Sequence, residues 1–201
     1  MRFPLRVVIL FVIVGLIVPV SLVAIGSGTG LIALPYQMFE LARRAPVLFP
    51  THMVSSALAL LLAPLVVASR HRPEFHRPLG RLLDVFVVIG GLTALPVAVM
   101  SHSSIAARTG FFAQGLVWLY LFGAAYAAIR KRDIRRHSHL MTAMLAVTTG
   151  AVWFRLLTGT AIVLNFPFEP AYALAAWAGW LIPLSIVVLN PRLVRSLLLA
   201  R

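Results

Sequence analysis

The feature that most constrains this chain is a series of apolar runs, each roughly 20 residues long and almost free of charge. A helix of that length crosses the hydrocarbon core of a bilayer, which is about 30 Å thick. The 201 residues are 61% hydrophobic and only 11% charged, which is too little charge to cover a soluble domain. The sequence therefore predicts an all-α protein, a polytopic bundle of transmembrane helices.

Six spans can be drawn, joined by short connections. They are Leu5–Ile25, Val47–Ser69, Leu82–Met100, Phe111–Ile129, Leu140–Leu164 and Ala171–Leu189. We expect one transmembrane domain over 1–201, with an anchor helix and loop in 1–45, core helices in 46–191 and a tail in 192–201. The alternative for the first span is a cleaved signal peptide, but its apolar stretch is longer than a signal-peptide core and favours an uncleaved anchor.

The basic residues gather on one side of this predicted bundle. Fourteen of the eighteen fall there: Arg2, Arg6, Arg70, Arg72, Arg77, Arg81, Arg130, Lys131, Arg132, Arg135, Arg136, Arg192, Arg195 and Arg201. Such asymmetry across short loops marks the cytoplasmic face, so we predict six spans with both termini cytoplasmic, in the inner (plasma) membrane. The expected partners are the lipid bilayer and anionic lipid head groups at that face. Nucleic acid is not expected, because no aromatic platform accompanies the charge.

Several chemistries are excluded by residue type. The chain has no cysteine, which excludes disulfides, thiolate metal sites and iron–sulfur clusters. It has five acidic residues, and three of them (Glu74, Asp84 and Asp133) fall near the predicted cytoplasmic face, so no carboxylate relay crosses the membrane. Neither a glycine-rich phosphate loop nor a zinc-protease pattern of two histidines and a glutamate is present.

The histidines fall into two layers. His52 lies at the predicted outer end of the second span and His102 at the outer end of the third. His76 and His137 come just before the third and fifth spans and define a cytoplasmic layer, while His71 and His139 are interpreted as solvated. Two such layers are what two haems with paired histidine ligands require.

We therefore predict up to two haem b groups, with iron bound by His76 and His137 inside and by His52 and His102 outside. Propionate groups need cationic partners, for which Arg77, Arg81 and Arg136 are candidates inside and Arg43, Arg44 and Arg155 outside. The alternative for each histidine is a helix-capping or lipid-facing role without metal.

Arg155 is a basic residue that falls well inside a predicted span, far from either end of it. A charge at that depth must face the bundle or extend to the interface. Two roles stay open for it: a structural ion pair with Glu169 or Glu40, or an anchor for an anionic ligand. Asp84 is interpreted as a structural partner of Arg81 or of an arginine in the connection 130–139.

The segment His76-Arg77-Pro78-Leu79-Gly80-Arg81 carries a resemblance to a known family. With the residues around it, this segment resembles the predicted membrane proteins called domain of unknown function 2306, over about Pro50–Pro191. The matching positions are His52, His76, Arg77, Gly80, Arg81, Asp133, His137, Met141 and Arg155. Pro78, Leu140 and Ala143 depart from the family pattern, which has an aromatic residue, tryptophan and arginine there.

The histidine layout is also similar to that of cytochrome b561 and ferric-reductase-like bundles, which implies haem held between neighbouring spans. The leading hypothesis is an oxidoreductase in which a b-type haem moves electrons across the membrane. A redox or assembly partner protein is expected to act with it. A second hypothesis is a non-enzymatic accessory or assembly protein. A third is a small transporter or lipid-binding bundle in which Arg155 anchors an anion.

Overall fold

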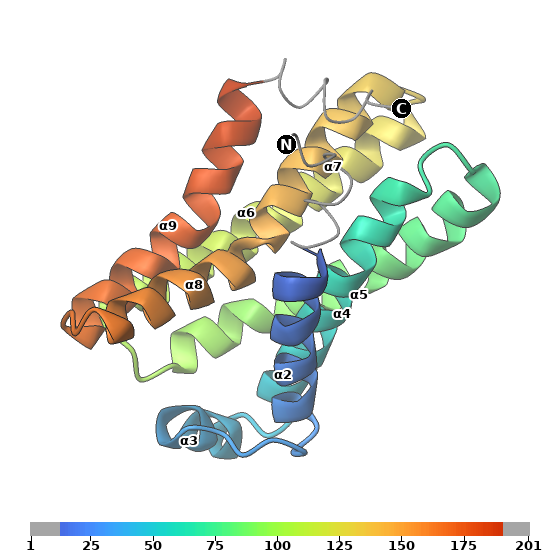
Figure 1. The fold of residues 1–201 in the computed structure, drawn as a ribbon. Coiled ribbons are helices and arrows are strands. Elements are labelled where there is room, and N and C mark those ends of the chain that lie inside the picture. The colour runs from blue at the N-terminus through green and yellow to red at the C-terminus, as the bar shows by residue number, and fades with distance from the viewer. Residues whose placement is uncertain (1–12, 191–201) are drawn as a thin grey trace, which may run out of the picture. The chain divides into compact units, whose positions relative to one another are not determined.

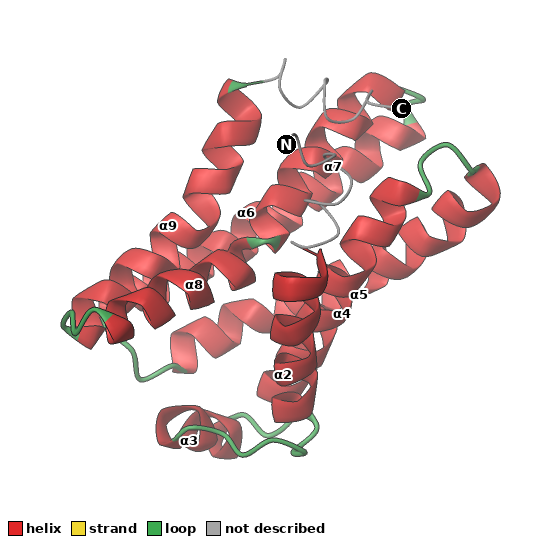
Figure 2. Ribbon diagram, in the orientation of Figure 1, coloured by secondary structure: helices red, strands yellow, loops and turns green. Residues whose placement is uncertain are grey.

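The structure, a computed structural model, describes residues 13–190, and every element in that range is a helix (Figures 1 and 2). The elements are the π-helix η1 (Ile13–Ile17) and the α-helices α2 (Val18–Gly28), α3 (Tyr36–Arg44), α4 (Leu48–Ala68), α5 (Pro73–Met100), α6 (Ile105–Arg130), α7 (Ile134–Thr148), α8 (Gly150–Val163) and α9 (Phe168–Leu189). The chain forms two compact units, Met1–His102 and Ser103–Arg201.

Five of the predicted spans are confirmed as apolar helices long enough to cross a membrane. Four of these are α4, α5, α6 and α9, and the fifth is α7 together with α8, Ile134–Val163. The first predicted span, Leu5–Ile25, falls partly outside the described residues. Its described part belongs to a shorter apolar helix, Gly15–Gly28.

The connections at the basic side are shorter than the sequence predicts. The predicted connections Arg70–Arg81 and Arg130–His139 are wrong in extent, because α5 begins at Pro73 and α7 at Ile134. Charge marks where the hydrocarbon ends, but it does not end a helix. Proline at the first helical position starts α5, since its missing N–H would have no partner there. The remaining turns, 69–72 and 131–133, are called the basic turns below.

Asp133 starts α7 by capping it, because its Oδ1 accepts a hydrogen bond of 2.9 Å from the Arg136 amide. Replacing Asp133 by alanine is expected to lower the free energy of unfolding by about 1 kcal/mol, as this amide then loses its partner. Thermal unfolding in detergent measures the effect. Asp133→Asn keeps an acceptor and is the control; equal destabilisation by both variants would contradict the capping role.

The first unit is built around the antiparallel pair α4 and α5 (Figure 1). Helix α2 packs on α4, and the short helix α3 lies at their ends. A buried cluster joins all four: Ala24, Leu41, Ala45, Phe49, Met53, Ala57 and Val97. Helix α3 falls in a stretch predicted as a connection, because nine residues are too few to show as a span.

The second unit contains α6, α7, α8 and α9, with α6 against α7 and α8 against α9. Helices α8 and α9 approach closely at Gly179, where an added Cβ would lie 3.1 Å from the Phe154 amide nitrogen and 3.2 Å from the Gly150 carbonyl oxygen. Small residues permit such approach between helices in membranes, where close packing is a main source of association.

The fifth predicted span is broken at Thr149, which ends α7 and precedes α8. Polar side chains of α6 form hydrogen bonds around this break, one of them to the backbone. Gln114 Nε2 donates to the Val147 carbonyl at 3.2 Å, and Trp118 Nε1 donates to Thr148 Oγ1 at 2.8 Å. Because lipid offers no hydrogen bonds, an interrupted helix at membrane depth needs such partners.

Candidate functional site

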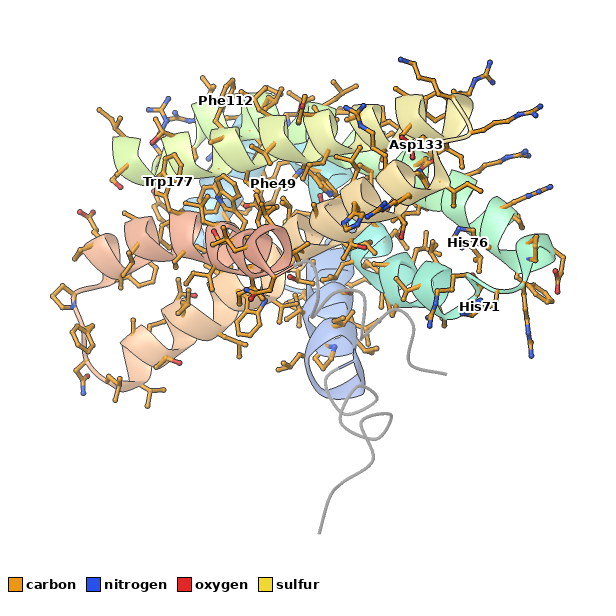
Figure 3. The ribbon with its side chains drawn as sticks, turned by 90° about the horizontal axis from the view of Figure 1, so that it is seen from above. Phe49, His71, His76, Phe112, Asp133 and Trp177 are labelled. Atoms are coloured by element: carbon orange, nitrogen blue, oxygen red, sulfur yellow. The ribbon has the colours of Figure 1, made fainter. Side chains whose placement is uncertain are left out.

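His76 and His137 occupy equivalent places in two helical hairpins. Each is the fourth residue of its helix, after a basic turn. His76 Nδ1 lies 3.0 Å from the Val66 carbonyl oxygen on α4, and His137 Nδ1 lies 3.0 Å from the Ala125 carbonyl oxygen on α6. Figure 3 shows His76 near the turn that contains His71. In both hairpins, therefore, a histidine at the start of one helix is fixed to the end of the helix before it.

His52 makes the same kind of bond in the opposite direction. Its Nδ1 lies 2.9 Å from the Gly90 carbonyl oxygen, so a histidine of α4 is bonded to α5. Ser56 Oγ lies 3.4 Å from the same nitrogen. His52 precedes Val66 by fourteen residues, and His76 precedes Gly90 by fourteen. The two bonds thus join α4 to α5 at levels about 21 Å apart.

These bonds determine which ring nitrogen carries hydrogen. A carbonyl oxygen only accepts, so Nδ1 must be the donor in all three imidazoles. In the neutral ring, Nε2 then has a lone pair. Nε2 of His76 and of His137 makes no hydrogen bond to any described residue. Metal-binding histidines characteristically donate the other ring N–H to a carbonyl in this way, which orients the ring and raises its basicity.

Within residues 13–190, no group of three or more histidine, cysteine, aspartate or glutamate side chains is arranged to hold a metal ion.

The structure places His52 and His102 at different levels. His102 is exposed and follows α5. The Gly90 carbonyl that His52 bonds lies ten residues before the end of that helix, about 15 Å along its axis. The structure does not bring these two imidazoles together.

The predicted inner propionate partners are accessible. Arg77 and Arg81 are exposed on α5, as is Arg136 on α7. Among the histidines predicted to be solvated, His71 is exposed and His139 is partly buried. Arg77 and Arg81 are four residues apart and so lie on one face of their helix.

Arg155 lies on α8, and its Nη1 donates to the Ala151 carbonyl oxygen at 2.9 Å. The ion pair predicted with Glu169 is not present in the described part of the second unit, where no carboxylate lies within ion-pair distance of Arg155. Glu40, the other predicted partner, belongs to the first unit and contacts Arg43 at 3.5 Å. Of the two roles left open for Arg155, the ion pair with Glu169 is therefore not formed: Glu169 lies in the first turn of α9, while Arg155 Nη1 bonds a carbonyl one turn back toward Thr149.

The apolar helices and the charge distribution define the class: a multi-pass helical membrane protein. The chain belongs to the family described as "Predicted membrane protein (DUF2306)", whose model matches residues 49–190. No curated protein and no solved structure matches the chain. The family match covers all three histidines bonded through Nδ1.

The sequence interpretation missed the polar residues around the helix break, Gln114, Trp118 and Thr148. Two signals point to the break: Thr148 and Thr149 followed by Gly150 inside an apolar span, and one amide, Gln114, at membrane depth.

Proposed function

We propose that this chain is a b-type haem protein of the membrane that transfers electrons within or across the bilayer. One observation carries the proposal: His76 and His137 both donate Nδ1–H to a main-chain carbonyl, which directs the basic Nε2 away from the bonded helix. Haem b would supply reversible one-electron transfer. The proposal assigns His76 and His137 as inner ligands, as the sequence topology does.

The protein's own residues contribute orientation and charge. The Val66 and Ala125 carbonyls hold the two rings and increase electron density at Nε2. Arg77 and Arg81 are the proposed partners of propionate carboxylates. For His52 we propose the outer ligand role, without His102 as its partner. The Gly90 carbonyl that His52 bonds lies about 15 Å along α5 from the helix end that precedes His102.

We further propose the topology that the charges predict: six spans, both termini cytoplasmic, in the inner membrane. The support is that both basic turns, 69–72 and 131–133, follow helices that run in the same predicted direction, α4 and α6. Their arginines and lysine are the proposed contacts of anionic head groups.

Electron transfer across reconstituted vesicles tests the proposed function. Vesicles that contain the protein and trapped ferricyanide are treated outside with dithionite, and the absorbance of ferricyanide is followed. Reduction faster than in protein-free vesicles is expected, with a reduced α-band appearing first. If the haem is reduced while ferricyanide stays oxidised, electron transfer reaches only one face of the membrane. If ferricyanide is reduced no faster than in empty vesicles and no α-band appears, the proposal is excluded.

A second candidate function has one observation in its favour. The same Nδ1 bonds connect antiparallel helices and so stabilise the hairpins without any metal. The chain would then be a non-enzymatic accessory or assembly protein that acts with a partner protein. This second function predicts that the purified protein is colourless. Replacing the histidines should then lower its stability and have no other effect.

A further inference from the structure

Helix α3 exposes an aromatic side at one end of the first unit (Figure 1). Tyr36 and Phe39 are three residues apart, so they lie on the same side of the helix, and they are 78% and 50% exposed. The apolar side chains of Leu31 before the helix and Val47 after it are exposed as well. Exposed apolar residues that gather in this way mark an interaction surface.

The opposite side of α3 is already in use, because it packs on the rest of the first unit. Leu41 is buried there and Met38 is partly buried, against the cluster that contains Phe49 of α4 and Val97 of α5. These contacts fix how the helix is turned about its axis. The aromatic side therefore faces away from the helices on which α3 rests.

A polar side lies between the buried and the aromatic sides. At 3.6 residues per turn, Glu40 and Arg44 fall in this third sector of the helix. Arg43 follows the aromatic residues, and its Nη1 lies 3.5 Å from Glu40 Oε1, so its side chain reaches back to the polar sector. A helix that presents protein, apolar and charged surroundings on three sides is suited to lie in the plane of a membrane interface.

The level of α3 along the membrane normal agrees with this orientation. Helix α4 has 21 residues and is about 30 Å long, which is the thickness of the hydrocarbon core. The basic turn 69–72 follows one end of α4, and α3 ends at Arg44, just before the other end begins at Leu48. Helix α3 thus lies where the hydrocarbon meets the head groups, at the face opposite to this basic turn. Tyrosine is enriched at that level in membrane proteins.

We propose that α3 is an interfacial helix and that its aromatic side binds the lipid surface at this face of the membrane. Tyr36 and Phe39 insert among the lipid head groups, while Glu40 and Arg44 stay at the aqueous edge. Insertion holds this end of the first unit at a fixed depth. The proposal rests neither on haem nor on which face of the membrane is cytoplasmic.

Spin labels on single introduced cysteines test the proposal, because the chain has no cysteine of its own. Phe39→Cys and the matched control Arg44→Cys are labelled in the full chain and reconstituted in vesicles of phosphatidylethanolamine and phosphatidylglycerol. Collisions of each label with oxygen, which concentrates in the bilayer, are compared with its collisions with a water-soluble nickel chelate. We expect the ratio of oxygen to nickel collisions to be several-fold higher at position 39 than at position 44.

The other outcomes overturn the proposal in different ways. Equal ratios at positions 39 and 44 would place both sides of α3 in water. Exclusion of both reagents from position 39 would mean that protein and not lipid covers the aromatic side, and dipolar broadening would then identify a second copy of the chain. Tyr36→Cys, which keeps the Phe39 ring, should give the same high ratio, and it decides the matter if Phe39→Cys does not fold.

Discussion

Asparagine at position 76 is expected to remove most of the haem absorbance of the purified protein while the fold stays intact. The asparagine side-chain nitrogen occupies the place of Nδ1 and can still donate to the Val66 carbonyl, but nothing replaces Nε2. Loss of an axial ligand should weaken haem retention by more than about tenfold. The Soret band per chain and the thermal unfolding temperature measure the two effects. His137→Asn is expected to behave in the same way.

Two further variants separate ligation from hairpin stabilisation. His76→Leu removes both nitrogens, so it should lose haem and also about 1 kcal/mol of stability, the usual contribution of one hydrogen bond. His71→Asn changes an exposed histidine and should leave both readouts unchanged. If His76→Asn keeps the full Soret band, His76 is not a ligand. If the preparation is colourless and only His76→Leu is destabilised, the accessory function is the better account.

The second large effect is expected at Gly179. A leucine there must place its Cβ 3.1 Å from the Phe154 nitrogen and 3.2 Å from the Gly150 oxygen, and these backbone atoms cannot move aside as a flexible side chain would. Separating α8 from α9 should cost about 3 kcal/mol, the upper part of the range for overpacking. Unfolding in mixed micelles of rising denaturing-detergent content measures the loss.

Gly159 offers a matched control on the same hairpin. An added Cβ there meets no atom within 4 Å, so Gly159→Leu should be neutral or slightly stabilising, because glycine is a poor helix former. If Gly179→Leu and Gly159→Leu destabilise the protein to a similar extent, then loss of glycine itself is responsible, and not the close approach of α8 to α9.

The spans were predictable because lipid imposes a strong and local requirement: a long apolar run is needed wherever a helix crosses. The ends of the helices were less predictable from the sequence. Arg77, Arg81 and Arg136 look like loop residues by charge, yet all three are helical, since a helix that leaves the hydrocarbon has no reason to stop. Pro73 and Asp133 are the local signals that mark the true starts.

Residue types at the site were also visible in the sequence, but their partners were not. His52, His76 and His137 are conspicuous in an apolar chain, whereas the carbonyls of Gly90, Val66 and Ala125 are ordinary backbone. Which carbonyl a ring meets depends on the register between two helices. The same limit applies to Arg155, whose candidate partner Glu169 is near in sequence but makes no ion pair with it in the described residues.

Haem iron per polypeptide is the most direct test of the central claim, that the Nε2 atoms of His76 and His137 bind haem. The wild-type chain and the double variant His76→Asn, His137→Asn are produced side by side in haem-replete cells and purified identically. Iron by elemental analysis and haem b by the pyridine haemochrome are then compared with protein concentration. The account predicts haem b in the wild type and its loss at the inner site of a folded double variant. An iron-free, colourless wild type, or a double variant with unchanged haem content, would contradict it.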